Sequence, residues 1–255
     1  MKSKIHDPST SELAKQYQEK YKSMSKNFYI AFSFVIASTS LFAQNATTQK
    51  ADQYFNQYEY VNAANAYLKI VDNGKADGYV YKQLADSYFN MFNTAEAAKW
   101  YAKATQTKQD AETYYRYAQM LKANGKYEEA NKQMQQFASL APNDQRAKTF
   151  KENPNYIPKL FDLSKLYEVK SGTFNSDKSD FGAVLNNNQV YFTSARNNSR
   201  KDYGWNKEPY LDLYQADYNT DGTIANVRNI SELNSKYHDG PASLSADGNT
   251  LYFAS

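Results

Sequence analysis

The chain has 255 residues, room for one large domain or two ordinary ones, and its 41% hydrophobic and 22% charged residues exclude a wholly disordered chain. A mean hydropathy of −0.83 excludes a polytopic membrane protein, and the lack of cysteine excludes disulfides, zinc–thiolate sites, thiol catalysis and a lipid-modified N-terminal cysteine. The net charge of +3 comes from residues 1–43, because the remaining residues hold 24 bases and 24 acids. A basic nucleic-acid footprint is therefore absent from the body of the chain.

The N-terminal region has the pattern of a secretory signal peptide. Lysines precede an uncharged apolar stretch, residues 28–43, which is too short to cross a bilayer comfortably and ends at Ala43, before the polar Gln44. We expect residues 1–43 to be a leader that is cleaved between Ala43 and Gln44. Met24 would be the conventional start of such a leader. The alternative is a buried core helix over residues 28–43, which would normally show a polar face.

The next hundred residues contain a repeat of about 34 residues. Ala51, Ala85 and Ala118 are spaced by 34 and 33 residues, and a second alanine follows each after twelve, at Ala63, Ala97 and Ala130. Small residues at two fixed places let paired helices approach closely, while large residues fill the seam between them. This pattern resembles tetratricopeptide repeats (TPRs), which implies an α-solenoid over residues 44–152. The predicted helix ends and caps are Asn73-Gly74, Asn93-Thr94, Asn124-Gly125 and Ala141-Pro142, with a solvating cap helix over residues 144–151.

Half of the 24 tyrosines lie in this block, where we interpret most of them as fillers of the helix seam. Some inner-helix residues fall outside the seam. If the units stack as the TPR resemblance implies, these residues face the concave groove and are candidates for binding a protein partner. They are Tyr79, Lys82, Phe89, Tyr115, Gln119 and Lys122.

After a linker over residues 153–166, whose prolines discourage helix, short apolar runs predict strands over residues 167–255. The four clearest are residues 190–193, 211–217, 225–230 and 251–254. The region repeats internally, because Leu185 corresponds to Leu244 and Tyr191 to Tyr252. Four strands per period indicate a β-propeller blade. The expected fold is therefore multidomain, a TPR-type α-solenoid followed by an incomplete β-propeller.

The residues 234–253, with Asp239-Gly-Pro-Ala242 and Ser245-Ala-Asp-Gly248, resemble the WD-type propeller of Bacteroidetes outer-membrane proteins of the OmpA family. In that family a signal sequence, TPRs, the propeller and an OmpA-like peptidoglycan-binding domain follow in order, and members include components of the type IX secretion and gliding machinery. This chain departs from the pattern in two ways: it has no lipid-acceptor cysteine and no OmpA-like domain. We interpret it as an N-terminal fragment of such a protein.

Two motifs suggest chemistry and are explained more simply. Residues 217–224 imitate the start of a calcium loop, but Arg228 stands where the bidentate glutamate belongs, so we predict a hairpin turn. His238 precedes Asp239, but no nucleophile motif accompanies them, so we predict a structural hydrogen bond. No P-loop, dinucleotide fingerprint or zinc signature is present. The sequence predicts no enzyme, no cofactor and no metal.

The resemblance implies a non-catalytic, exported scaffold at the periplasmic face of the outer membrane. It would bind envelope proteins through the repeats and the propeller, and in full-length relatives it would tether an outer-membrane machine to peptidoglycan through the OmpA-like domain. The alternatives are the N-terminal part of an exported propeller-containing peptidase or other hydrolase, and a TolB-like periplasmic adaptor. Nucleic acid is not an expected partner, and association with the outer membrane would be indirect.

Overall fold

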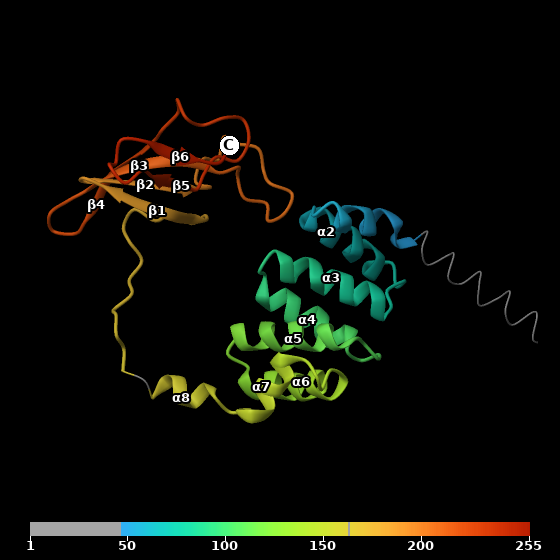
Figure 1. The fold of residues 1–255 in the computed structure, drawn as a ribbon. Helices are drawn as coiled ribbons and strands as arrows, with labels where there is room; N and C mark the ends of the chain where they lie inside the picture. The colour runs from blue at the N-terminus through green and yellow to red at the C-terminus, as the bar shows by residue number, and fades with distance from the viewer. Residues whose placement is uncertain (1–46, 163) are drawn as a thin grey trace, which may run out of the picture. The chain divides into compact units, whose positions relative to one another are not determined.

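A computed structural model describes residues 47–162 and 164–255 (Figure 1). The predicted signal peptide, its cleavage point at Ala43 and Gln44, and the start at Met24 lie outside these residues. By its packing the chain divides into two units, residues 1–50 and 51–255, and every labelled helix and strand belongs to the second unit. No helix of the described part has the length and apolar character that crossing a membrane requires.

The helical part is a series of helices, in which each helix from α2 to α7 packs against its neighbour in the chain (Figure 1). A helix over residues 47–56 precedes α2, and further pairs follow with the 33- to 34-residue period seen in the sequence. The helical part is therefore a TPR-like array of helix pairs. Its remaining helices are α2 (Tyr60–Asp72), α3 (Gly78–Asn90), α4 (Thr94–Ala104), α5 (Ala111–Ala123), α6 (Tyr127–Leu140), α7 (Gln145–Glu152) and α8 (Ile157–Phe161).

Local capping chemistry explains where these helices begin and end. The predicted cap Asn93 accepts a hydrogen bond from the backbone N–H of Glu96, and Asp144 starts α7 in the same way. Gly74 and Gly125 adopt φ values of 68° and 73°, which a residue with a Cβ adopts only at a cost. The linker differs from the prediction, since α8 forms within it. Pro158 lies in the first turn of α8, where its missing N–H breaks no helical hydrogen bond.

The repeated alanines are the tightest points of the helical core. Ala63, Ala85, Ala97, Ala118 and Ala130 are all fully buried, as close helix packing at the seam requires. The tyrosine prediction is only partly right. Four of the twelve tyrosines of this block are buried, whereas the others are half-buried or exposed and so do not act as core fillers alone; the buried ones are Tyr60, Tyr67, Tyr101 and Tyr117.

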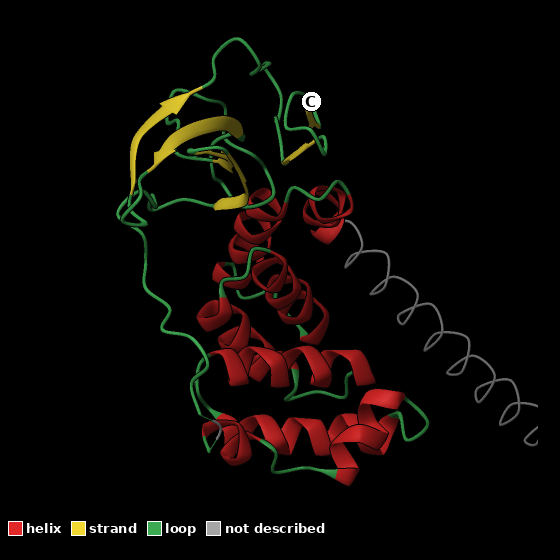
Figure 2. Cartoon of the chain, turned by 60° about the vertical axis from the view of Figure 1, so that its left-hand side comes forward, coloured by secondary structure: helices red, strands yellow, loops and turns green. Residues whose placement is uncertain are grey.

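The C-terminal part is built of antiparallel strands (Figure 2). Four of them form one sheet in the order of the chain, and two more form a second sheet. An apolar cluster around Phe192 and Tyr214 packs on the first sheet, and Leu213 packs with Ala242 and Phe253. A closed propeller is not present in the described residues. The strands are β1 (Asp180–Asn186), β2 (Gln189–Ser194), β3 (Asp212–Tyr218), β4 (Ile224–Asn229), β5 (Ala242–Leu244) and β6 (Leu251–Phe253).

The internal repeat of the strand region shows most clearly in two aspartates with equivalent hydrogen bonds, Asp180, the first residue of β1, and Asp239, which lies three residues before β5. One carboxylate oxygen of Asp180 accepts hydrogen bonds from the N–H and hydroxyl of Ser176, and Asp239 makes the same two bonds to Ser235. The other oxygen of Asp180 binds the guanidinium of Arg196 at 2.8 Å. Burial alone would raise the pKa of Asp180, but the bonds from Ser194, Arg196 and Ser176 outweigh it and lower the pKa to about 2.

This pKa predicts a pH-dependent contribution to stability. Because the folded pKa lies below the ordinary value of about 3.9, the Asp180 charge stabilises the fold above about pH 4 and stops doing so as the pH falls toward 2. Asp180→Asn should therefore have a lower unfolding midpoint than the unsubstituted chain at pH 6, and the difference should shrink by pH 2. Thermal unfolding followed by circular dichroism measures it. The control is Asp177→Asn, at a position whose side chain is 84% exposed. A difference in unfolding midpoint between Asp180→Asn and the unsubstituted chain that stays constant with pH would contradict the lowered pKa of Asp180.

Candidate functional site: a cavity at the end of the helical repeats

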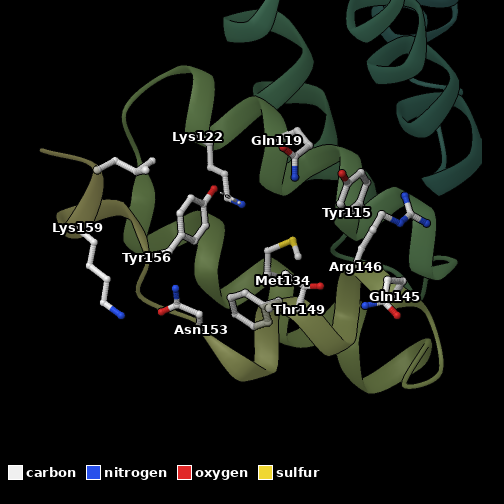
Figure 3. A pocket seen from close by; sticks show the side chains of 12 residues that line it. Tyr115, Gln119, Lys122, Met134, Gln145, Arg146, Thr149, Asn153, Tyr156 and Lys159 are labelled. Atoms are coloured by element: carbon white, nitrogen blue, oxygen red, sulfur yellow. Dashed lines mark hydrogen bonds between the residues drawn. The ribbon is translucent and has the colours of Figure 1, made fainter. Parts of the chain in front are cut away.

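A cavity of about 650 Å³ opens at the C-terminal end of the helical array (Figure 3). We call it the end cavity. The side chains of Met134 and Phe150 are nearly buried in it, and the rings of Tyr115 and Tyr156 stand in its walls. Its lining comes from α5, α6, α7, α8 and the residues between the last two helices. The lining residues are Tyr115, Gln119, Lys122, Met134, Gln145, Arg146, Thr149, Phe150, Asn153, Tyr156, Lys159 and Leu160.

A difference between otherwise equivalent repeats accompanies this cavity. In the second unit the buried hydroxyl of Tyr101 on α4 donates a hydrogen bond to Asp86 on α3. In the first unit Tyr67 donates in the same way to Asp52. The equivalent pair in the third unit is Gln119 and Met134, and both of these side chains line the end cavity. A thioether cannot donate a hydrogen bond, so the tie between inner and outer helix that the first two units have is missing in the third.

In the middle of the array, around Asp86, the charges are by contrast already paired. The buried Asp86 carboxylate forms ion pairs with Lys82 at 2.7 Å and with Arg116 at 3.1 Å. Burial alone would lower the pKa of Arg116, but Asp86 and Tyr101 raise it above its ordinary value. The guanidinium also lies over the ring of Phe89, 5.1 Å from its centroid. The charged groups in this part of the array are therefore held by one another.

Arg146 on α7 lies between the ionic group around Asp86 and the end cavity. Its guanidinium pairs with Asp144 and Glu112, each at 2.9 Å, and these bonds hold the pKa of Arg146 above its ordinary value. It also lies 4.1 Å from the ring centroid of Tyr115, a cation–π distance. Arg146 thus lines the cavity with its positive charge already compensated.

Two lysines of the end cavity have no such compensation. The ammonium of Lys122 meets the neutral phenol of Tyr156, with its Nζ 3.4 Å from the hydroxyl oxygen and 5.3 Å from the ring centroid. Lys159 forms no ion pair with any residue that the structure describes. None of the lining residues is acidic. The end cavity therefore combines an apolar interior with the positive charges of Lys122 and Lys159, which no acid of the described residues pairs with.

Most of the predicted groove residues divide between these two environments. Tyr115, Gln119 and Lys122 line the end cavity. Lys82 and Phe89 contact the ionic group around Asp86 and Arg116. Tyr79 lies in neither environment and donates a hydrogen bond to Asp52. Burial first, and this hydrogen bond second, raise the pKa of Tyr79 to about 12.

The sequence reasoning missed the contribution of α7 and α8. Residues 144–151 were expected to form only a solvating cap, yet α7 buries Ala147 and Phe150 against the array. The sequence does contain a signal for this packing, because Ala147 and Phe150 are three residues apart and so lie on the same face of a helix. That inner face supplies one side of the end cavity. Tyr156 and Lys159 carried no comparable signal, since they lie in the predicted linker.

The two motifs of the strand region have the structural roles that the sequence favours. Asp217 binds Gln189, Asn226 and Arg228, and Gly222 turns the hairpin between β3 and β4 with a φ of 84°. His238 accepts a hydrogen bond on Nδ1 from the backbone N–H of Leu211, at 3.1 Å.

Comparison with known proteins finds similarity only among solved structures. No family model and no curated protein matches the chain. The TPR domain of Arabidopsis OM64 is 18% identical, with a TM-score of 0.39, and the match covers 44% of this chain and 94% of that one. The first TPR of Spaghetti (RPAP3) bound to an HSP90 peptide is 25% identical, with a TM-score of 0.39 and coverage of 46% and 91%. The first TPR domain of human RPAP3 is 22% identical, with a TM-score of 0.38 and coverage of 46% and 94%.

The ion pairs of Asp86 predict a stability effect. Asp86→Asn keeps the shape of the side chain but leaves Lys82 without its anionic partner and Arg116 with only the more distant Glu112, at 3.5 Å. Because both bases are partly exposed, we expect the lower end of the usual cost, about 2–3 kcal/mol, and a melting temperature lower by about 4–12 °C. Differential scanning calorimetry measures the shift. Asp72→Asn, on an exposed position of α2, is the control, and equal melting temperatures for the two variants would show that the pairs contribute nothing.

Proposed function

We propose that this protein is a non-catalytic scaffold of the cell envelope, which binds protein partners through the concave face of its TPR-like array. One observation carries the binding part of the proposal. The charged groups in the middle of the array are paired with one another, whereas the end cavity is open, apolar and positively charged, a combination suited to a partner rather than to stability alone. The mechanism is docking, in which the repeats form a rigid surface and the partner supplies the complementary segment.

The cellular setting is the second part of the proposal. The lysine-led apolar stretch of residues 28–43 supports export, and the resemblance to OmpA-family proteins of Bacteroidetes supports the periplasmic face of the outer membrane as the place. The strand region would be a second interaction platform, one blade of a WD-type propeller with the opening of the next. In relatives that carry an OmpA-like domain, that domain would grip peptidoglycan, so that the protein would tether an outer-membrane machine to the cell wall. Linked binding modules would raise the effective concentration of each for its target.

Site-specific photo-crosslinking in living cells tests the docking surface. A benzoylphenylalanine in place of Gln119, which lines the end cavity, should form a crosslink to a defined partner protein identified by mass spectrometry. The same group in place of Lys132, an exposed residue of α6 outside the cavity, is the matched control and should give no such product. Crosslinks of equal yield from both positions, or from neither, would contradict docking at this face.

The same cells test the cellular setting. Cell fractionation should recover the crosslinked protein with the envelope, and N-terminal sequencing of the mature chain should begin at Gln44. A mature chain that retains residues 28–43, or that stays with the cytosolic fraction, would count against export while leaving the docking result intact.

A further inference from the structure

We propose that the end cavity binds an extended segment of a partner protein in which a large apolar side chain lies next to a carboxylate. This inference rests on the proposed docking function and names the chemistry of its ligand.

The apolar part of the ligand follows from the size and lining of the cavity. A volume of about 650 Å³ lies inside the range of about 300–1,000 Å³ that is typical of ligand sites. Met134 and Phe150 form its nearly buried surface, and Leu160, which is 55% exposed, stands at its edge. A methionine beside aromatic rings adapts readily to the shape of an aliphatic or aromatic anchor. A fully polar segment would leave this surface without partners.

The carboxylate follows from the charges. No acid lines the cavity, Arg146 is already compensated by Asp144 and Glu112, and Lys122 and Lys159 are not compensated. Among the described residues, the Lys122 ammonium meets the phenol of Tyr156 and no acid. A carboxylate would add an opposite charge to this ionised donor and so form an ion pair, which the phenol cannot form. A basic segment would instead add to the repulsion.

The peptide nature of the ligand follows from the remaining polar groups. The side-chain amides of Gln119, Gln145 and Asn153 surround the cavity (Figure 3), and none of them forms a side-chain hydrogen bond with the residues that the structure describes. Each amide offers a donor and an acceptor, which matches the alternating C=O and N–H groups of an extended backbone. A fatty acid has a carboxylate and an apolar chain, but it would leave these amides unpaired.

Fluorescence anisotropy with the full chain tests the ligand. The probes are labelled octapeptides with Leu, Met, Phe or Trp at the centre, each flanked by Glu. Their counterparts carry Lys in place of Glu, or Ser in place of the apolar residue. At least one acidic–apolar peptide should bind ten times more tightly than both of its counterparts, and this preference should weaken as the NaCl concentration rises.

Variants tie the binding to the cavity. Lys122→Met/Lys159→Met should weaken binding of the best peptide at least tenfold, and Leu160→Ser should weaken it without disturbing the core. Lys132→Met/Lys148→Met removes two charges from exposed positions of α6 and α7 outside the cavity, so its affinity should equal that of the unsubstituted chain. Circular dichroism melting of each variant separates lost binding from lost folding.

Three outcomes would overturn the inference: equal affinity for the acidic peptides and their counterparts, unchanged affinity in Lys122→Met/Lys159→Met, or displacement of the peptide by dodecanoate at the same concentration as by unlabelled peptide. The last would assign the cavity to a lipid-like ligand. A crosslink at Gln119 that persists alongside such a result would leave the docking function standing and reject only the ligand chemistry. Loss of both would reject both.

Discussion

The organisation of the helical array depends on one hydrogen bond that ties an inner helix to its outer partner. In the first two units a buried tyrosine of the outer helix donates to an aspartate of the inner helix, Tyr67 to Asp52 and Tyr101 to Asp86. Burial first, and the nearby aspartate second, raise the pKa of both phenols, so they remain neutral donors at any physiological pH. The two helices of each of these units pack together around this hydrogen bond. The third unit keeps the repeat spacing and the buried alanines but not the bond, and there the end cavity lies.

The same aspartate decides how charge is distributed over the concave face. Asp86 is needed by Tyr101 and also holds Lys82 and Arg116, so the bases in the middle of the face are committed to the fold. The third unit has the neutral Gln119 at that position, and Lys122 therefore has no anion to pair with. Two changes in the repeat, Met134 in place of the tyrosine and Gln119 in place of the aspartate, thus remove the tie and the counter-charge. The proposed binding surface thus lies where the third unit differs from the first two, at Gln119 and Met134.

Local features of the fold could be predicted from the sequence, and pairings between distant residues could not. The cap at Asn93 and the turn at Gly74 depend only on neighbouring residues, and the alanine spacing sets the helix pairs. The ion pair between Asp86 and Arg116 joins residues thirty positions apart, and sequence spacing does not show which base an acid will meet. For this reason the sequence suggests Lys82 as a ligand-binding residue, whereas in the structure its ammonium pairs with Asp86. The antiparallel sheet agrees with the strand pattern, and the incomplete propeller that the resemblance implies stays a prediction, because the described residues form one four-stranded and one two-stranded sheet.

The most direct test of this account restores the missing tie. In Gln119→Asp/Met134→Tyr the third unit receives the aspartate–tyrosine pair of the first two, so the ring should occupy the end cavity and the new carboxylate should compensate Lys122. Isothermal titration calorimetry with the best-binding acidic–apolar peptide should then detect no binding, while the melting temperature should not fall below that of the unsubstituted chain. Undiminished peptide binding in a folded double variant would contradict the claim that the absent pair creates the binding site.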